Sequence, residues 1–423
     1  MMKAAVRALS VCDARCVVVA IVCLVALSAC AESRQTRALA TAPVDWSRVL
    51  VVPEGMVLKS GRTHYYDMRS WEQIREPEFH ISSSGFSEGL CVARREPNGK
   101  AGFIDAAGHV VIPFRYDEAY AFDHGRASVY VGDQHGVIDT SGRWVVEPGT
   151  YERLVGYSEG RCAFLHPKRE GEAEAYWGFL GFNGEPLGIG EFQKVGTMPL
   201  VFREGRCLAK TRLGDVVFVD YKGRARVRLA NPEWDAWPFS DGLARVNMAV
   251  DVRTDEEKER FYEAGAAVPT LLPRFGFIDK EGHLVIEPRF TSAGDFTEGL
   301  APASTTDEGL IHPGGEYMPD EDQQGFERRW GFIDKQGVWV IPMVYEQVRH
   351  FHNGLAPFKE NGKWGYVNRQ GTEVLPPQFD EAWEFERGVA KVVIEGEVAV
   401  IDASGRIVLR TRLKYAPICA LGS

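Results

Sequence analysis

Apolar and polar positions follow one pattern that recurs eight times between Phe86 and Gly405. Each copy begins with an aromatic residue followed three positions later by glycine, continues with Gly-Phe-Ile-Asp-x-x-Gly or a variant, and closes with a short apolar run. The first element occurs at Phe86/Gly89, Phe122/Gly125, Tyr157/Gly160, Phe202/Gly205, Phe239/Gly242, Phe296/Gly299, Phe351/Gly354 and Phe385/Gly388. A period repeated this often predicts a repeat fold and argues against most enzyme folds.

The second element predicts a hairpin turn in every copy. Its clear copies are Gly102–Asp105, Gly136–Asp139, Gly276–Asp279, Gly331–Asp334 and Gly365–Asn368, and weaker copies begin at Gly178, Val217 and Ala399. A glycine closes every copy, at Gly108, Gly142, Gly184, Gly223, Gly282, Gly337, Gly371 and Gly405. Asp at the first position and Gly at the fourth are the preferences of a type I turn.

The residues beside this turn predict short strands. They are aromatic or β-branched runs too short for helices, such as Gly102–Ile104 before the turn and Val110–Ile112 after it. A proline is expected to end the second strand, at Pro113, Pro148, Pro288, Pro342 and Pro377. The Phe-x-x-Gly step opens a third strand, so each unit is expected to be an antiparallel meander of about three strands.

Such a unit is too small to bury its apolar face alone, so the eight units must stack into one continuous core. The sequence therefore predicts an all-β repeat protein, arranged as a propeller-like ring or as an open β-solenoid. Ring closure is favoured because it protects the strand edges. A repeat of about 34 residues, as from Gly331 to Gly365, is short for a four-stranded blade, which argues against the ring and for the open solenoid.

The repeat resembles the WG β-repeat (KWG-type repeat) family, named for a Trp-Gly pair before the Phe/Tyr-Ile-Asp strand. That pair occurs at Trp177-Gly178, Trp330-Gly331 and Trp364-Gly365, and Gly362–Tyr366 is the best match. The resemblance covers Phe86 to Leu409, with Ala101, His135 and Phe275 in place of the tryptophan in other copies. It implies a bacterial β-repeat module, often exported, with no catalytic residues to transfer.

The first thirty residues predict an export signal. Lys3, Arg7 and Arg15 precede an apolar stretch that ends near Ala26. The following Leu27–Cys30 resembles a bacterial lipobox, in which Cys30 would be lipidated, carry fatty acids such as palmitate and become the mature N-terminus. The alternative is a transmembrane anchor, but the apolar stretch is shorter than the roughly 20 residues that a bilayer requires.

These features divide the chain into five parts. We expect a lipoprotein signal peptide at 1–29, a flexible tether at 30–45, an N-terminal lead-in segment at 46–85, the eight repeats at 86–411 and a C-terminal tail at 412–423. Ala31 follows the modified cysteine. By analogy with Gram-negative sorting, the absence of aspartate there predicts the periplasmic side of the outer membrane.

Charge and cysteine content narrow the possible partners. The net charge of −10 becomes −12 when the leader, with its net charge of +2, is removed, which argues against nucleic acid as a partner. Cys91, Cys162 and Cys207 occupy a slot that holds alanine in the other repeats, so we expect small core residues there. Nothing in the sequence predicts a cofactor, a metal site, a phosphate loop or a nucleophile elbow.

Spacing between the two elements shows where the repeat is interrupted. Phe122 to Gly136 is 14 residues, whereas Phe239 to Gly276 is 37 and Phe296 to Gly331 is 35. The insertions, at 250–273 and 304–328, fall in the same hairpin of the fifth and sixth repeats. We expect a short helix in the first and an irregular loop in the second. Because repeat proteins place such additions on one face, we expect the two to be adjacent.

Three functions compete. We expect a non-catalytic scaffold that binds an envelope protein or glycan through Tyr262, Glu263, His312, Glu316, Tyr317, Asp320 and Asp322. A carbohydrate-binding module using Trp234, Trp237 and Trp383 is the second possibility, although Trp237, Trp383 and Tyr120 lie at a slot that favours core packing. The third is a glycoside hydrolase that pairs Asp251 or Glu263 with Glu316 or Asp320.

Two histidines flank a repeat phenylalanine and could chelate a metal. They are His350 and His352, on either side of Phe351. Side chains alternate between the two faces of a strand, so both should lie on the exposed face opposite the buried ring. We expect them to be exposed side chains and not metal ligands.

The lipobox makes a direct prediction about Cys30. Replacing its thiol in Cys30→Ala removes the only acceptor of the lipid, so metabolic labelling with radiolabelled palmitate should be abolished while the wild type is labelled. Labelling that persists in Cys30→Ala would contradict the lipoprotein assignment.

Overall fold

A computed structural model describes residues 44–53, 63–74, 77–155, 157–166, 175–229, 234–251, 271–305 and 329–415. The chain divides into two compact units, Met1–Trp46 and Ser47–Ser423, and the described residues lie almost entirely in the second. Apart from one 3-10 turn, η1 (Trp46–Arg48), the regular elements of the described residues are all β-strands. The fold class is all-β, as predicted.

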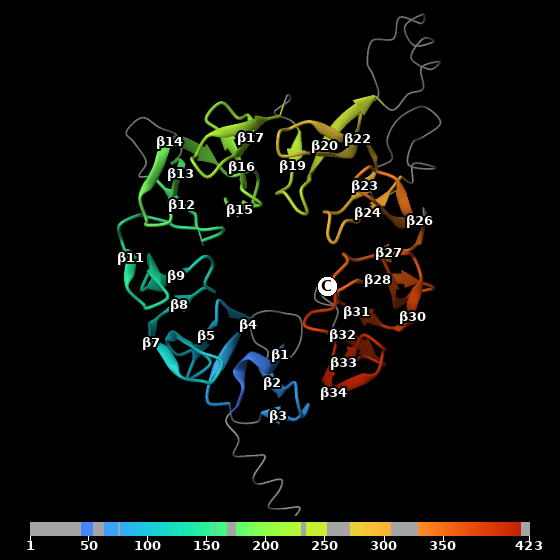
Figure 1. Ribbon diagram of the computed structural model, residues 1–423, viewed down its shortest axis with the longest axis horizontal. Coiled ribbons are helices and arrows are strands. Elements are labelled where there is room, and N and C mark those ends of the chain that lie inside the picture. Colours follow the sequence, from blue (N-terminus) through green and yellow to red (C-terminus); the bar gives the residue numbers. More distant parts are fainter. Residues whose placement is uncertain are drawn as a thin grey trace, which may run out of the picture. The chain divides into compact units, whose positions relative to one another are not determined.

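The strands occur in consecutive groups (Figure 1). The lead-in sheet holds β1 (Val49–Pro53), β2 (Thr63–Asp67) and β3 (Gln73–Ile74). The first repeat holds β4 (His80–Ser87), β5 (Leu90–Arg94), β6 (Ala101–Ile104) and β7 (Val110–Tyr116). The second holds β8 (Glu118–Ala119), β9 (Arg126–Val131), β10 (Gln134–Asp139) and β11 (Trp144–Val146).

The third repeat holds β12 (Cys162–Leu165), β13 (Trp177–Leu180) and β14 (Pro186–Gln193). The fourth holds β15 (Phe202–Arg203), β16 (Arg206–Thr211), β17 (Val216–Val219) and β18 (Ala225–Arg228). The fifth holds β19 (Asp235–Ala236), β20 (Ala244–Asp251), β21 (Leu271–Ile278) and β22 (Leu284–Phe290).

The sixth repeat holds β23 (Ser292–Ala293), β24 (Ala301–Ser304), β25 (Trp330–Ile333) and β26 (Trp339–Tyr345). The seventh holds β27 (Gln347–Val348), β28 (Leu355–Glu360), β29 (Lys363–Asn368) and β30 (Glu373–Phe379). The eighth holds β31 (Glu381–Ala382), β32 (Val389–Ile394), β33 (Glu397–Asp402) and β34 (Ile407–Lys414).

The described strands form eight antiparallel sheets, but these are not simply the eight repeats. The third and fourth repeats share one seven-stranded sheet, because β14 pairs with β16 through Phe192 and Thr211. The remaining sheet is the lead-in sheet β1–β3, which precedes the first repeat. Most repeats are the predicted three-stranded meander with a two-residue strand added in front, as β8 is added to β9–β11.

The predicted Asp-x-x-Gly turn is present. In the first repeat, Asp105 Oδ1 accepts hydrogen bonds from the amides of Ala107 (3.0 Å) and His109 (2.8 Å), and the following Gly108 has a φ of 87°. The third repeat lacks this aspartate, and there the Glu185 carboxylate accepts from the Asn183 amide instead. The Phe-x-x-Gly step is a second tight turn. Its glycine and the residue before it both have positive φ, as in a type I′ hairpin turn.

The glycine before the Phe-Ile strand is required because the outer strand crosses over it. A Cβ on Gly331 would lie 2.4 Å from the carbonyl oxygen of Ile341. In three other repeats the equivalent glycine meets the equivalent carbonyl at 2.5–2.6 Å: Gly102 with Ile112, Gly276 with Ile286 and Gly365 with Leu375. The outer strand bulges at this point: Phe332 pairs with Ile341 and Trp330 with Tyr345.

The prolines expected to end the outer strand lie inside it in four repeats. Pro113, Pro288, Pro342 and Pro377 fall within β7, β22, β26 and β30, so the prediction was wrong for these positions. Proline has no backbone N–H to donate to a neighbouring strand. At a bulge of an edge strand no such hydrogen bond is required, so proline is tolerated there. Only Pro148 follows the end of its strand, β11.

Successive repeats are joined by pairs of buried aromatic rings. The phenylalanine or tyrosine of one Phe-Ile strand contacts the Phe-x-x-Gly phenylalanine of the next repeat. The pairs are Phe103–Phe122, Phe179–Phe202, Phe218–Phe239, Phe277–Phe296, Phe332–Phe351 and Tyr366–Phe385, with ring centroids 4.7–5.1 Å apart. The second and third repeats meet instead through a cluster that contains Val137, Cys162 and Tyr157.

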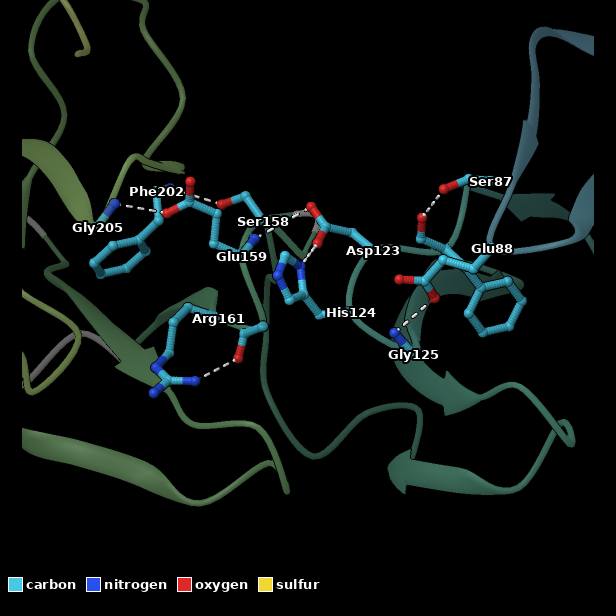
Figure 2. Close-up of polar contacts among 12 residues, drawn as sticks. Ser87, Glu88, Asp123, His124, Gly125, Ser158, Glu159, Arg161, Phe202 and Gly205 are labelled. Atoms are coloured by element: carbon cyan, nitrogen blue, oxygen red, sulfur yellow. Dashed lines mark hydrogen bonds and ion pairs between the residues drawn. The ribbon is translucent and has the colours of Figure 1, made fainter. Parts of the chain in front are cut away.

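A polar contact runs beside each aromatic pair (Figure 2). The side chain before the turn glycine accepts a hydrogen bond from an amide of the next turn, as Glu88 Oε2 does from Gly125 (2.7 Å) and Glu159 Oε2 from Gly205 (2.8 Å). In the second repeat, where His124 precedes the turn glycine, Asp123 Oδ2 takes this role and accepts from the Glu159 amide (3.2 Å). Equivalent bonds are Glu204–Gly242, Asp241–Gly299, Glu298–Gly354 and Asn353–Gly388. We call these contacts the turn clamps.

The lead-in sheet joins the last repeat to the first. Tyr66 of β2 packs in one cluster with Val400 and Leu409 of the eighth repeat. On its other side, the Tyr65 hydroxyl lies 3.4 Å from His80 Nδ1 at the start of the first repeat. Contacts between consecutive sheets therefore form a closed cycle, which is the arrangement of a β-propeller. The lead-in sheet thus closes the ring between the last and the first of the described repeats.

The bulge over the repeat glycine makes a stability prediction. Gly331→Ala places a methyl group against the backbone of Ile341 and Pro342, so we expect the free energy of unfolding in urea to fall by about 1–3 kcal/mol. Val338→Ala, at a residue that is 60% exposed, should change it by less than about 0.5 kcal/mol. Equal effects from both variants would show that the close approach does not constrain this position.

Candidate binding site

Every binding residue predicted in the insertions lies outside the described residues. These are Tyr262, Glu263, His312, Glu316, Tyr317, Asp320 and Asp322. The lipidation residue Cys30, the tail cysteine Cys419 and the helix expected in the first insertion also lie outside them. The site must therefore be built from the strands that carry the insertions.

The stems of both insertions are equivalent hairpins. β20 and β21 pair over eight residues, from Ala244↔Ile278 to Asp251↔Leu271, and the first insertion connects them. The second insertion connects β24 and β25, which pair at Ala301↔Ile333. Each stem consists of the second and third strands of its sheet, so the prediction that the insertions fall in the same hairpin is confirmed. Phe275 of the first stem and Ala303 of the second pack in one hydrophobic cluster.

A buried arginine links the two repeats that carry the insertions. The side chain of Arg245, on β20, is 16% exposed, and its guanidinium lies 4.2 Å from the centre of the Trp237 ring. Arg245 donates a hydrogen bond to the carbonyl of Ala293, and its Nε lies 3.5 Å from Asp295 Oδ1 in the sixth repeat. Burial lowers the pKa of Arg245, and the Asp295 carboxylate opposes that shift.

His350 of the seventh repeat reaches back to the same place. Its Nε2 lies 2.9 Å from the position that a Cβ on Gly294 would occupy, so the absence of a side chain there makes room for the ring. Burial lowers the pKa of His350, while Asp295 and Glu384 act in the opposite direction and His352 and Arg245 add to the lowering. The expectation that both histidines are exposed was wrong for His350 and correct for His352.

Three buried polar atoms in this place lack a hydrogen-bond partner: Arg245 Nε, Asp295 Oδ1 and His350 Nε2. The first two face each other as an ion pair at 3.5 Å. We call these three residues the Arg245 cluster. Buried polar atoms without partners are uncommon in proteins and often mark the position of bound water, an ion or a ligand. The cluster is therefore the best candidate for a binding site among the described residues.

Sequence reasoning missed this cluster, although a signal was present. The slot two residues before the repeat phenylalanine holds Tyr120, Trp237, Arg349 or Trp383 in four repeats, but Gly294 in the sixth. The slot directly before it is charged or titratable at Asp295, His350 and Glu384 and uncharged at Ala121 and Pro238. The titratable residues Asp295, His350 and Glu384 thus occur in three consecutive repeats, and the first of them follows Gly294, where the large side chain of the other repeats is absent.

The three tryptophans proposed to stack on sugars make contacts within the protein. Trp237 packs against Arg245 and Phe275, and Trp383 lies beside Arg349 and Tyr415. Trp234 is partly buried against the core of the fourth and fifth repeats. The prediction that the side chain at this shared slot packs in the core is wrong for Tyr120, which is 54% exposed.

The three repeat cysteines are buried core residues, as predicted. Cys91, Cys162 and Cys207 are free thiols with at most 1% exposure. Burial raises the pKa of all three thiols, that of Cys91 to about 12, so they are un-ionised at neutral pH. Among the described residues, no three His, Cys, Asp or Glu side chains are grouped to hold a metal ion, and no helix could span a membrane.

A comparison with protein families finds part of the repeat. Five segments match the family described as "WG containing repeat", at residues 102–134, 136–165, 275–307, 330–364 and 364–397. No curated protein matches the sequence.

Solved structures resemble this chain at low sequence identity. A eukaryotic initiation factor aligns with a TM-score of 0.48 and 10% identity, over 87% of this chain and 97% of that one. The computationally designed protein Ika8 gives 0.35 and 12%, over 79% and 87%. BamB from Moraxella catarrhalis gives 0.35 and 12%, over 70% and 82%.

The partly buried position of His350 makes a prediction about pH. Its pKa is lower in the folded protein than the ordinary 6.5, so protonation favours the unfolded chain. Folding stability that depends on neutral His350 is fully present above pH 6.5 and is lost progressively as the pH falls below it. In His350→Gln, the loss of unfolding free energy between pH 7.5 and pH 5.5 should therefore be smaller than in the wild type, as measured by urea unfolding.

His352→Gln is the matched control, because it changes an exposed histidine two residues away. It should keep the pH dependence of the wild type. An identical slope in His350→Gln and the wild type would contradict the buried neutral state of His350.

Proposed function

We propose that this chain is a non-catalytic binding scaffold of the bacterial cell envelope. In this proposal the repeats form a rigid support, and the insertions of the fifth and sixth repeats contact an envelope protein or glycan. Cys30 carries the lipid that holds the scaffold on the periplasmic side of the outer membrane. Nucleic acid is not a partner, and no cofactor takes part.

The observation that carries the proposal is the position of the two stems. β20–β21 and β24–β25 are equivalent hairpins of consecutive sheets with a shared hydrophobic cluster, so the segments they carry start from one region. Repeat proteins commonly place their binding elements on such neighbouring additions. Arg245 and Asp295 of the Arg245 cluster lie in the same two repeats, His350 comes from the seventh, and the cluster provides polar atoms that a ligand or water can satisfy.

The repeated motif residues support a scaffold role for the remaining repeats. Their aromatic rings fill the contacts between repeats, their aspartates hold turns, and the residues before the turn glycines form the turn clamps. Side chains engaged in this way stabilise the fold and are poorly placed to act on a substrate. This argues for specific binding at the interruptions of the repeat.

The carbohydrate-binding alternative has less support, because Trp237 and Trp383 already pack against arginines and aromatic rings of the chain. The hydrolase alternative depends on Glu263, Glu316 and Asp320, which lie outside the described residues, and on Asp251, the last residue of β20. A glycan array tests the first alternative, and the release of sugars from envelope glycans tests the second.

The proposal predicts that folding and binding can be separated. Residues 252–270 and 306–328 are replaced by short turns on the stems, and the double deletion should still unfold cooperatively on heating. It should lose a partner that the wild type captures from envelope extracts. The matched control replaces residues 167–174, which lie between β12 and β13 in the third repeat, and should keep the partner.

Two results would contradict the proposal. Loss of cooperative unfolding in the double deletion would show that the insertions are part of the core. Retention of the partner by a folded double deletion would place the binding surface elsewhere.

A further inference from the structure

The imidazole of His350 lies where four consecutive repeats meet. Arg245 belongs to β20, Asp295 follows β23, His350 and His352 follow β27, and Glu384 follows β31 (Figure 1). Burial is the largest influence on the pKa of His350 and lowers it; the Asp295 and Glu384 carboxylates oppose this shift, and His352 and Arg245 add to it. A proton on this ring therefore acts on charged groups of the fifth, sixth and eighth repeats as well as its own.

Asp295 faces a cation that holds it loosely. Its Oδ1 lies 3.5 Å from Arg245 Nε, beyond the usual range of an N–H···O hydrogen bond, and both atoms are buried without a hydrogen-bond partner. The pair therefore lacks the short, charge-assisted hydrogen bonds that make an arginine–carboxylate contact strong. Arg245 also donates to the carbonyl of Ala293 on β23, so its side chain ties the fifth repeat to the first strand of the sixth.

His350 has an unused nitrogen beside this pair. Its Nε2 is buried without a hydrogen-bond partner and lies 2.9 Å from the position of a Cβ on Gly294, the residue directly before Asp295. A neutral imidazole has one donor and one acceptor nitrogen, whereas a protonated one has two donors. Protonated His350 therefore has an additional donor to satisfy, and Asp295 has a buried oxygen that accepts no hydrogen bond.

We propose that His350 is a proton-operated latch, which on protonation takes the Asp295 carboxylate from Arg245. The imidazolium and the Arg245 guanidinium carry like charges, so their repulsion adds to the release of Arg245. The exchange loosens β20 from β23 and draws β23 toward the seventh repeat. This goes beyond the proposed function, which requires no pH dependence, and it acts on β20, the strand that leads into the first insertion.

The direction of the pH response follows from the surroundings of the ring. With Arg245 on Asp295, the pKa of His350 is lower than the ordinary 6.5, whereas pairing with a carboxylate raises the pKa of an imidazole. The exchanged arrangement therefore binds the proton more tightly and gains population as the pH falls below 6.5. For a released His350 with its ordinary pKa, the step from pH 7.5 to pH 5.5 raises that population by up to about tenfold.

Amide hydrogen exchange at Gly294 tests the latch. The Gly294 amide donates to the carbonyl of Pro302 at 2.8 Å, and the equivalent amide of Tyr120 donates to Ser128 at 3.0 Å in the second repeat, which has no titratable residue in the slot before its phenylalanine. Exchange is measured by mass spectrometry on the full chain at pH 7.5 and pH 5.5 and corrected for the intrinsic effect of pH. In the wild type, protection at Gly294 should fall by up to about tenfold at pH 5.5, while protection at Tyr120 should not change.

Three variants separate the latch from a general effect of acid. His350→Gln cannot take up the proton, so protection at Gly294 should be equal at the two pH values. Asp295→Asn removes the carboxylate that is exchanged and should also abolish the pH dependence. His352→Gln is the matched control at an exposed histidine and should respond as the wild type does. Cooperative thermal unfolding at pH 7.5 verifies folding, and either of the first two variants carries the test if the other does not fold.

Four results would overturn the proposal. Protection at Gly294 that is independent of pH in the wild type excludes the exchange, and an unchanged response in His350→Gln or in Asp295→Asn assigns it to other groups. Loss of the response in His352→Gln assigns it to the exposed histidine. An equal loss of protection at Tyr120 shows that acid destabilises the whole fold. No partner is needed for these measurements, so their outcome is independent of the proposed function.

Discussion

The contact between one Phe-Ile strand and the turn phenylalanine of the next repeat is the interaction on which the whole structure depends. A sheet of three or four short strands cannot bury its apolar face alone. Pairs such as Phe332–Phe351 bury that face between neighbouring sheets, with ring centroids 4.7 Å apart. The turn clamps run beside these pairs and fix the neighbouring turns relative to one another.

The slots directly before the turn phenylalanine vary, whereas the packing between repeats does not. Residues that pack between repeats are aromatic, aliphatic or small, as Phe277, Leu243 and Ala301 are. The same slot holds Ala121 in one repeat and Asp295 or His350 in others. The Arg245 cluster arises from such substitutions, with Gly294 leaving space for the ring of His350. A binding site can thus form on a scaffold whose core is unaltered.

Closure of the ring imposes a different constraint on its ends. Every internal repeat meets a neighbour with the same turns, whereas the eighth meets a lead-in sheet of a different sequence. The closing contacts are accordingly unlike the others: Tyr66 packs with Val400 and Leu409, and Arg387 donates to the carbonyl of Ser47. At this turn a donor replaces the acceptor that the other turns use.

The sequence by itself determined the all-β class, the Asp-x-x-Gly turn and the buried cysteines, because these depend on local preferences for turns and strands and on the period of the repeat. It also located the interrupted hairpins, since spacing along the chain is independent of packing. Tertiary structure decided the bulge that places proline inside the outer strand, the role of β1–β3 in closing the ring, and the partial burial of His350. Each of these depends on contacts between residues that lie far apart in the sequence or in different repeats. Alternation within one strand describes which face a side chain points to, but only the neighbouring repeat determines whether that face is covered.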